Sequence, residues 1–242
     1  MLNIAKGAIP LYMQIKELLI EKITTGEWVP GDIIPSEIQL AQELGVSPGT
    51  VRSAITELVE SNVLMRKQGR GTFVANHDPQ RALFHFFHIS DNQGHKVLPE
   101  SSVLRGRRKQ ATRFESLKLQ IPTKAEIIKI ERVRKISDKP TIIETITLPA
   151  ALFGKLGDNN AYQLPNTLYE LYEKEFGITI HSANEELRAV AASKHEASLL
   201  DIEVGTPLLE IERVALRLDK TPVELRISHC STKNHYYQNT IF

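Results

Sequence analysis

Two N-cap signals near the N-terminus, at Ser36 and Ser47, are so close in the sequence that they strongly constrain the local fold. Ser36 opens a capping box, because its hydroxyl can accept the backbone N–H of Gln39 while the Gln39 side chain reaches back. Gly45 then ends that helix. Ser47 is a good N-cap for a second helix, and Pro48 stands at its first position. Two capped helices joined by so short a turn must cross steeply, so the sequence predicts a helix-turn-helix.

The flanking segments extend this motif. Residues 10–26 carry leucines and isoleucines at helical spacing, which predicts a preceding helix. After the second helix, residues 63–65 and 72–74 resemble two short strands. Residues 67–71 join them as a basic, glycine-containing hairpin, which we interpret as a wing. The whole segment therefore predicts a winged helix-turn-helix in residues 1–76.

The character of the chain changes near residue 76. Residues 77–83 are predicted to be a linker, and residues 84–242 a second domain rich in β-branched and alternating residues. Strands are predicted at 127–136, 141–148, 178–190, 208–218 and 223–228, and helices at 111–119, 167–176 and 193–200. Strands interspersed with single helices indicate an α+β domain with a largely antiparallel sheet.

The second domain contains an internal echo. Residues 127–133 (IIKIERV) match residues 208–214 (LLEIERV), and each run is followed by Asp-Lys, then a proline and a glutamate. We interpret the two runs as related hairpins of one sheet. The alternative is convergence, because strand–turn–strand sequences resemble one another.

Composition sets limits without naming a function. The chain has 242 residues, a net charge of +1 and one cysteine, Cys230. A single cysteine excludes an intramolecular disulfide and argues against a cysteine-based zinc site. With no signal pattern and no membrane-spanning run, we expect a cytoplasmic protein without membrane contact. Residues 1–76 hold seven basic and eight acidic side chains, so nucleic-acid binding there must depend on where the charges lie.

The second helix of the motif is the candidate recognition helix. Its N-terminus presents free N–H groups and the positive end of the helix dipole, which suit a phosphate, and Arg52 can reach a phosphate or a guanine edge. The alternative is a protein-binding module with a solvated basic turn. The candidate DNA-contact residues are Ser36, Ser47, Pro48, Gly49, Thr50, Arg52, Ser53, Lys67, Gly69 and Arg70.

These motifs resemble the GntR family of regulators. The N-terminal resemblance covers residues 8–75 and includes GEWVPGDIIPSE at 26–37, GVS at 45–47, TVR at 50–52 and QGRGTFV at 68–74. Residues 80–242 resemble the effector domain of its HutC subfamily, the UTRA domain, which implies a chorismate-lyase-like fold. Matching features there are ERVR at 131–134, Pro140 with Glu144, Leu148-Pro149, Leu168-Tyr169, FGI at 176–178, 208–213 and PVE at 222–224.

The resemblance also shows where this chain departs from its relatives. Ser47, Gly49, Thr50, Arg52 and Gly69 fall on family DNA-contact positions. Many relatives carry arginine at two further positions, where this chain has Ile38 and Pro48. We therefore expect weaker base readout by the helix and more reliance on the wing and the DNA backbone.

The effector site is predicted from strand 127–136, where Arg132 and Arg134 share a face with isoleucines. Arginines on an apolar face need anionic partners, either a ligand phosphate or carboxylate, or an internal glutamate. Arg213 repeats Arg132 in the second hairpin, which hints that this arginine is structural. With the resemblance, the candidate effector-binding residues are Arg132, Arg134, Glu144, Thr167, Tyr169, Glu224 and Arg226.

Two other clusters give weaker signals. His85 and His88 are three residues apart, but no carboxylate or cysteine completes a metal set beside them, so no metal and no cofactor are predicted. Residues 105–109 (RGRRK) are basic. A solvated strand end explains this run better than a second DNA contact.

The sequence and the resemblance together predict a homodimeric repressor. It would bind double-stranded, palindromic operator DNA and leave it when a small anionic effector, a phosphorylated sugar or a carboxylate metabolite, binds the second domain. The alternatives are an enzyme on the chorismate-lyase-like domain and a winged helix that binds protein. We see no nucleophile or acid/base pair that would support an enzyme.

Overall fold

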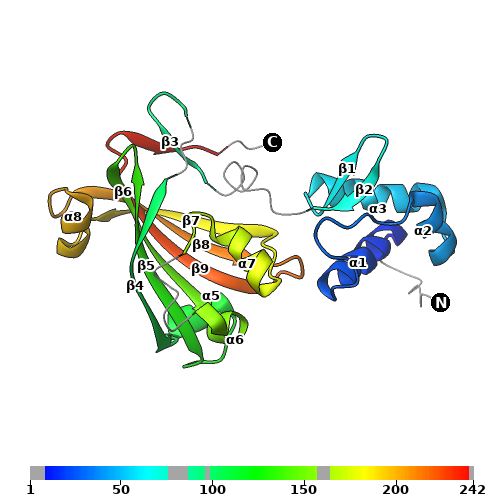
Figure 1. The fold of residues 1–242 in the computed structure, drawn as a ribbon, viewed down its shortest axis with the longest axis horizontal. Coiled ribbons are helices and arrows are strands. Elements are labelled where there is room, and N and C mark those ends of the chain that lie inside the picture. The colour runs from blue at the N-terminus through cyan, green and yellow to red at the C-terminus, as the bar shows by residue number, and fades with distance from the viewer. Residues whose placement is uncertain (1–8, 76–86, 96–98, 157–163, 240–242) are drawn as a thin grey trace. The chain divides into compact units, whose positions relative to one another are not determined.

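The computed structural model describes residues 9–75, 87–95, 99–156 and 164–239. Its contacts divide the chain into two compact units, residues 1–77 and 78–242, which are described separately (Figure 1). The predicted linker, residues 77–83, lies outside the described residues. No helix in the described part of the chain is long and apolar enough to cross a membrane.

The first unit is a three-helix motif followed by a hairpin. Its elements are α1 (Leu11–Thr24), α2 (Glu37–Leu44), α3 (Pro48–Glu60), β1 (Leu64–Lys67) and β2 (Gly71–Val74). The predicted caps are present: the Ser36 hydroxyl accepts the Gln39 N–H at 3.3 Å, and the Ser47 hydroxyl accepts the Thr50 N–H at 3.2 Å. Gly45 ends α2 with a φ of 67°, a conformation that glycine adopts without strain.

A small core holds the three helices and the wing together. α1 contributes Ile15 and Leu19, and α3 contributes Val51 and Leu58, all essentially inaccessible. The two wing strands pair antiparallel, and Gly69 makes their turn with a φ of 69°. The hairpin is anchored to the chain before α2, because Ile34 donates its N–H to the Thr72 carbonyl at 2.9 Å. These contacts fix the wing beside α3.

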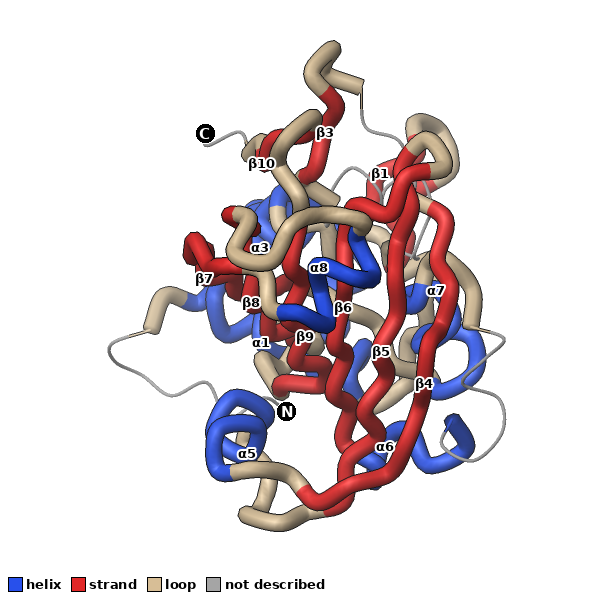
Figure 2. Tube along the Cα trace, turned by 90° about the vertical axis from the view of Figure 1, so that its left-hand side faces the viewer, coloured by secondary structure: helices blue, strands red, loops and turns tan. Residues whose placement is uncertain are grey.

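The second unit is built on one six-stranded antiparallel sheet in the order β4-β5-β6-β9-β8-β7 (Figure 2). This confirms the predicted α+β class. The strands are β4 (Glu100–Gln110), β5 (Glu126–Ile136), β6 (Lys139–Pro149), β7 (Ser182–Ala191), β8 (Pro207–Leu216) and β9 (Pro222–Cys230). The two echoed sequences are β5 and β8, each in a hairpin with its successor, and the hairpins meet at β6 and β9.

Helices cover both faces of this sheet, and a short two-stranded sheet lies at one end. The helices are α5 (Arg113–Leu119), α6 (Ala150–Phe153), α7 (Leu168–Phe176) and α8 (Lys194–Leu200); a 3-10 turn spans Gly154–Leu156, and β3 (Ile89–Asp91) pairs with β10 (His235–Tyr237). The face under α7 holds the main core, which includes Ile128, Ile146, Tyr172 and Val223. The opposite face packs Val133 and other residues against the α8 region.

The sequence-based assignments differ from the structure in a few places. The predicted strand 178–190 is shorter, since β7 begins only at Ser182. β4 is an 11-residue strand, whereas the prediction assigned only a strand end at residues 105–109. Its residues are mostly exposed because β4 lies at the edge of the sheet, so no clear apolar alternation marks it.

Candidate effector pocket and nucleic-acid interface

The N-terminus of α3 is an exposed polar edge. Ser47, Pro48, Gly49, Arg52 and Ser53 are all exposed. The Ser47 hydroxyl lies 2.8 Å from the Thr50 hydroxyl, so the two side chains form one hydrogen-bonding group at the helix start. The Ser53 hydroxyl donates to the Gly49 carbonyl at 3.1 Å. The helix therefore offers N–H groups, hydroxyls and a guanidinium along one accessible edge, which suits contact with phosphates.

The wing adds cations next to this edge. Lys67, Gly69 and Arg70 are exposed at the hairpin tip. The Lys67 ammonium lies 4.5 Å from the centre of the Phe73 ring, which restrains it on one face of the hairpin. Ser36 is also exposed, but its hydroxyl is already engaged with Gln39 in the capping box.

Glu37 ties the recognition helix to the wing. Its carboxylate accepts from Arg52 Nε of α3 at 2.7 Å and from Arg66 Nη2 of β1 at 3.2 Å. Arg66 also donates to the Thr56 hydroxyl at 3.1 Å. The side chains of Arg52 and Arg66 remain 66% and 45% exposed. Arg66 precedes Lys67 in the predicted basic wing, and the structure shows that its guanidinium contacts Glu37 and Thr56.

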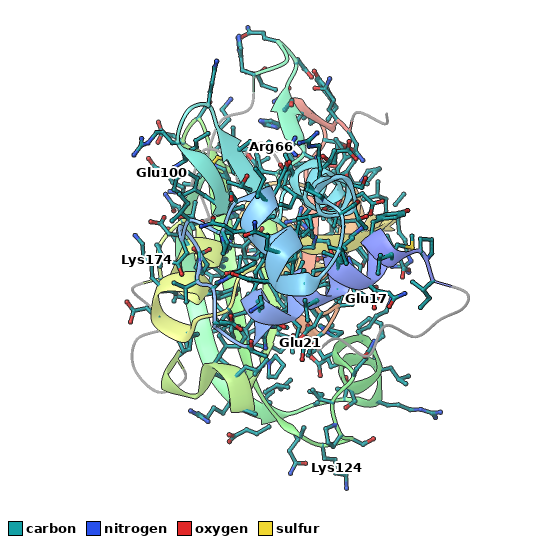
Figure 3. The ribbon with its side chains drawn as sticks, turned by 90° about the vertical axis from the view of Figure 1, so that its right-hand side faces the viewer. Glu17, Glu21, Arg66, Glu100, Lys124 and Lys174 are labelled. Carbon is teal, nitrogen blue, oxygen red and sulfur yellow. The ribbon has the colours of Figure 1, made fainter. Side chains whose placement is uncertain are left out.

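The placement of charge explains how a unit without net positive charge can present a basic edge. Figure 3 labels Arg66 on β1 and the acidic residues Glu17 and Glu21 on α1. These two glutamates are exposed on that helix. Glu57, another acid of the unit, is paired with Lys16 at 2.6 Å. The basic groups of α3 and the wing are thus on different elements from much of the acidic charge.

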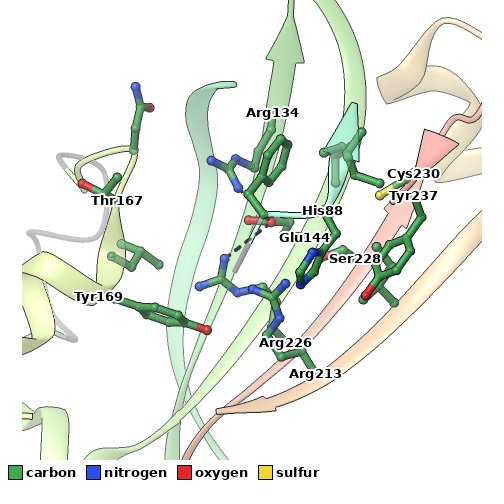
Figure 4. A pocket seen from close by; sticks show the side chains of 16 residues that line it. His88, Arg134, Glu144, Thr167, Tyr169, Arg213, Arg226, Ser228, Cys230 and Tyr237 are labelled. Atoms are coloured by element: carbon green, nitrogen blue, oxygen red, sulfur yellow. Dashed lines mark hydrogen bonds and ion pairs between the residues drawn. The ribbon is translucent and has the colours of Figure 1, made fainter. Parts of the chain in front are cut away.

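The second unit contains a pocket over the sheet, between the start of α7 and the β3–β10 pair (Figure 4). It encloses about 690 Å³ of space, its open mouth included. Five of the seven candidate effector residues line it: Arg134, Glu144, Thr167, Tyr169 and Arg226. The structure thus brings together residues that are up to 92 positions apart in the sequence.

The other two candidates lie outside the pocket lining, where they hold lining residues in place. Arg132 is 1% exposed and donates from Nε to Glu144 at 2.5 Å. Glu224 is fully buried and accepts from Arg226 at 2.9 and 3.0 Å. Glu224 also accepts from Tyr169 at 3.1 Å. The sequence left open whether the buried arginines pair with a ligand or with an internal glutamate. Arg132 and Glu224 both have internal partners, Glu144 and Arg226 respectively.

Glu144 is the hub of the arginine cluster. Besides Arg132, it lies 3.3 Å from Arg134 Nη1 and 3.5 Å from Arg226 Nη1. Burial alone would raise the pKa of Glu144, but the three positive charges outweigh it and hold that pKa well below the usual glutamate value. The carboxylate is therefore charged at neutral pH.

Burial and neighbouring charges also act on Arg134 and Tyr169. Burial, assisted by the charges of Arg132 and Arg226, lowers the pKa of Arg134 to about 10, although Glu144 opposes the shift. Burial and the charge of Glu224 raise the pKa of Tyr169 to about 12, so its hydroxyl stays protonated and can donate. At neutral pH the pocket thus presents guanidinium and hydroxyl donors.

Two donors in this cluster lack partners among the described residues. Arg132 Nη1 and Arg134 Nε are buried, and neither has a hydrogen-bond acceptor there. A buried donor without an acceptor costs free energy. The lining residue Arg134 therefore has capacity left for an acceptor that enters the pocket. Its guanidinium also lies 5.4 Å from the centre of the Phe87 ring, which forms part of the wall.

Sequence reasoning missed several lining residues. Arg213 pairs with Glu185 at 2.5 Å, which is the kind of structural role that the sequence repeat suggested. Arg213 also lines the pocket, which the repeat did not suggest. Ser228 and Cys230 follow Arg226 by alternation along β9, and that signal could have found them. The remaining missed polar or aromatic lining residues are Phe87, His88, Asn166 and Tyr237. No local pattern places these beside β5.

No group of three or more potential metal-ligating side chains occurs in the described ranges. His88 is a pocket-wall residue with its ring centre 5.1 Å from that of Tyr237. His85, its partner in the weak histidine pair, lies outside the described residues. The basic residues 105–109 are expected from the sequence to be solvated. They lie on β4, a mostly exposed edge strand, where Arg108 pairs with Glu126 at 2.7 Å.

Comparison with known proteins identifies the family. Residues 11–74 match the model of bacterial regulatory proteins of the gntR family, and residues 92–235 match the UTRA domain. The chain belongs to the GntR family, HutC subfamily. It is 33% identical over 225 residues to the HTH-type transcriptional repressor NagR of Bacillus subtilis, covering 92% of this chain and 91% of that protein.

Further relatives and solved structures agree with this assignment. The chain is 32% identical over 206 residues to the mannosyl-D-glycerate transport/metabolism system repressor MngR of Escherichia coli, covering 84% of each. It resembles the ligand-binding domain of a GntR-family regulator from Bordetella bronchiseptica (TM-score 0.60, 30% identity, 64% of this chain and 96% of that one). YydK of Bacillus subtilis shares the fold (TM-score 0.58, 19% identity, 97% and 100% covered).

These matches define the class of activity. GntR helix-turn-helix domains bind DNA, and UTRA domains bind small effector molecules. The relatives are transcriptional regulators and not enzymes, and several are named repressors. This GntR-family chain is accordingly a transcriptional regulator.

Proposed function

We propose that this regulator is a homodimeric repressor that leaves a palindromic operator when a small anionic metabolite enters the pocket of its UTRA domain. The observation that carries the proposal is the buried arginine cluster in and directly behind the pocket wall. The cluster combines four guanidinium groups with three carboxylates, so it keeps one positive charge in excess. The guanidinium groups belong to Arg132, Arg134, Arg213 and Arg226, and the carboxylates to Glu144, Glu185 and Glu224. A phosphate or carboxylate would neutralise the excess charge.

The arrangement of donors supports an anionic ligand with an apolar or hydroxylated body. Arg134 Nε has no acceptor among the described residues. Thr167 is the N-cap residue of α7, and its side chain makes no cap hydrogen bond. A phosphate or carboxylate between these two points would receive guanidinium and helix N-terminal donors together. The walls of Ile142, Ile211 and Leu168 would contact the rest of the ligand.

The DNA-binding proposal uses the exposed edge of α3 and the wing. Ser47, Thr50 and the first N–H groups of α3 would hold phosphates, and Arg52 would reach a phosphate or a base edge. Lys67 and Arg70 would lie along the minor groove or its phosphates. A homodimer would present two such edges, so we expect half-sites about one helical turn apart. Affinity should fall steeply with salt.

The test joins the two domains in one assay. The full chain is screened by thermal shift against phosphorylated sugars and carboxylate metabolites, and each hit is added to the protein bound to fluorescent DNA from upstream of its own gene. We expect at least one anion to stabilise the protein and release the DNA. Arg134→Ala should bind DNA but resist that anion. Anions that stabilise the protein without changing DNA affinity would contradict the proposal.

The two alternative functions have separate outcomes. Turnover of a chorismate-like substrate by the full chain would favour an enzyme, whereas the relatives named above are transcriptional regulators. Unchanged promoter binding by Arg52→Ala and Arg70→Ala would favour a winged helix that binds protein. Neither alternative has a supporting contact in the described residues that the repressor does not also explain.

A further inference from the structure

The internal echo of the sequence extends to two helices on the sheet face opposite the pocket. α5 precedes β5 and α8 precedes β8, and each helix has seven residues. Each begins with a capping box, formed by Thr112 and Glu115 in α5 and by Ser193 and Glu196 in α8. α5 packs on β9 and α8 packs on β6, so each helix covers a strand of the other hairpin. The two helices are thus matched in length, capping and position.

Two lysines connect α5 to the sheet. The Lys129 ammonium of β5 donates to Glu115, the capping-box glutamate, at 2.8 Å. Lys118 of α5 is paired with Glu212 of β8 and lies 2.7 Å from Glu186 of β7. Its hydrogen bonds to Glu186 and Glu212 raise the pKa of Lys118 above the usual lysine value. Lysine side chains carry their charge throughout the neutral range, so the contacts that dock α5 do not change with pH there.

Two histidines make the corresponding contacts of α8. His229 of β9 is paired with Glu196, the capping-box glutamate. The Nε2 atom of His195 in α8 lies 2.9 Å from Glu131 of β5. Glu131 and Glu212 occupy the same place in the two echoed runs, so the contact from the helix to the sheet is also matched. Unlike lysine, histidine ordinarily changes its charge between about pH 5 and 8.

The echoed strands show why α8 needs a cation from β9. Lys129 of β5 corresponds to Glu210 of β8, so the second hairpin has an acid where the first has the cation that binds the capping box. His229 pairs with Glu210 in the strand register, and its Nε2 atom lies 3.0 Å from that carboxylate. The ring therefore bridges two glutamates, one through each nitrogen. A neutral imidazole has one N–H and can donate to only one of them, whereas the imidazolium donates to both.

Arginines of the two edge strands complete the charges around these histidines. Arg188 of β7 donates to Glu210 at 3.1 Å, and Arg105 of β4 is paired with Glu131. The hydrogen bond from His229 lowers the pKa of Glu210, so this carboxylate is charged at neutral pH. Arginine does not lose its proton in proteins. Glu210 and Glu131 therefore each keep a cation when the histidines are neutral.

The Glu196 carboxylate depends on His229 more strongly. One of its oxygens accepts the Ser193 N–H at 2.8 Å in the capping box, and the other is paired with His229. Burial raises the pKa of Glu196, but the hydrogen bonds from Ser193 and His229 outweigh it and lower that pKa below the usual glutamate value. The Glu196 side chain is only 14% exposed. Loss of the imidazolium would leave its charge without a cation among its described contacts, which is unfavourable at this depth.

We propose that α8 is held on the sheet by a proton-dependent clasp, in which the imidazolium forms of His229 and His195 dock the helix and their deprotonation loosens it. The clasp stabilises the docked helix where the histidines are protonated, and this contribution is lost as pH rises. α8 also buries Ala197 and Leu200, so the helix opens more often rather than detaching. His229 stands between Ser228 and Cys230, two lining residues on the other face of β9, so the clasp and the pocket share a strand.

Hydrogen exchange of the full chain, without DNA or effector, measures the clasp independently of repressor function. Protection factors of peptides that cover α8 and α5 are compared at pH 6 and pH 9, each corrected for the intrinsic exchange rate. A docked state that holds one more proton than the open state opens up to about tenfold more often for each pH unit. We therefore expect α8 protection to fall at least about tenfold, while α5 protection changes by less than about twofold. Constant protection of α8, or an equal fall in both helices, would overturn the proposal.

Two variants separate the histidines from general destabilisation, and α5 protection shows in each that the domain is folded. His229→Gln removes the bridging cation, so α8 protection at pH 6 should already be close to the value of the unmodified protein at pH 9. His195→Lys sets a permanent cation before Glu131, so α8 should keep more of its protection at pH 9 than in the unmodified protein. His195 is 56% exposed, which makes this substitution tolerable for folding. An unchanged pH response of α8 in either folded variant would contradict the clasp.

Discussion

Within the described residues, a glutamate between arginines occurs at the surface of one unit and in the interior of the other. In the DNA-binding unit, Glu37 holds Arg52 and Arg66, whose side chains are 66% and 45% exposed. In the UTRA domain, Glu144 holds Arg132 and Arg134, whose side chains are 1% and 6% exposed. The ion-pair chemistry is alike, but the second group is shielded from water and its glutamate also lies 3.5 Å from Arg226 Nη1.

We call Arg52–Glu37–Arg66 the surface triad and Arg132–Glu144–Arg134 the buried triad. The difference in exposure suits the two triads to different tasks. Exposed ion pairs contribute little to stability, so Arg52 and Arg66 can exchange Glu37 for a DNA phosphate at small cost. Buried charges must stay compensated, so we expect Glu144 to stabilise the folded domain, while Arg134 Nε, which has no acceptor among the described residues, remains for a ligand. Comparing matched substitutions in the two triads tests this contrast.

The largest expected effect is on stability. Glu144→Ala would leave Arg132, Arg134 and Arg226 buried around an uncompensated charge, and we expect the free energy of unfolding to fall by about 3–5 kcal/mol. The matched change Glu37→Ala should cost at most about 1 kcal/mol. Urea denaturation of the full chain, followed by circular dichroism, measures both. Similar losses in the two variants would remove the distinction between the triads.

The caps and the strand alternation explain how much of this could be read from the sequence. Ser36 and Ser47 act through residues three positions away, so local spacing was enough to predict α2 and α3. Arg132 and Arg134 share a face by simple alternation along β5. The α+β class and the paired hairpins followed from the same local signals.

The composition of the pocket depends on tertiary contacts that no local pattern encodes. Phe87 and Tyr237 stand near opposite ends of the domain's sequence, and they meet in the pocket because β3 pairs with β10. Asn166 is placed by a hydrogen bond from the Ser101 N–H at 2.8 Å, across 65 residues of sequence. That Arg132 and Glu224 lie outside the lining also follows only from packing depth.

The second expected effect separates the two arginines by function. Arg52→Ala should lower DNA affinity by about 1–3 kcal/mol, roughly 5- to 150-fold, because it removes a charged contact to phosphate or base. Arg134→Ala should leave DNA affinity unchanged and weaken only effector binding. Fluorescence anisotropy with promoter DNA, repeated at two salt concentrations, measures the first. A loss of DNA affinity in Arg134→Ala with a native melting curve would show that the two triads are not separate.

A third effect is the response of stability to acid. The folded pKa of Glu144 is lowered by its arginine neighbours, although burial opposes the shift, so its contribution to stability is present above its unfolded pKa near 4.5 and is lost as pH falls below that value. Between pH 5 and 3, we expect the free energy of unfolding of Glu144→Gln to fall by roughly 1–2 kcal/mol less than that of the unmodified protein. Urea titrations at pH 5, 4 and 3 test this, and parallel curves would contradict it.

The smallest expected effect repeats the contrast between surface and interior with a different interaction. Phe87 lies under the buried Arg134 guanidinium at 5.4 Å, and Phe73 lies under the exposed Lys67 ammonium at 4.5 Å. Cation–π contacts strengthen when they are desolvated. Phe87→Leu keeps an apolar wall but loses the ring, so we expect effector affinity to fall by about 1 kcal/mol, roughly fivefold. Phe73→Leu should change DNA affinity by less than about half of that free energy. Isothermal titration and anisotropy give the two values, and a larger effect at Phe73 would mean that solvent exposure does not set the strength of these contacts.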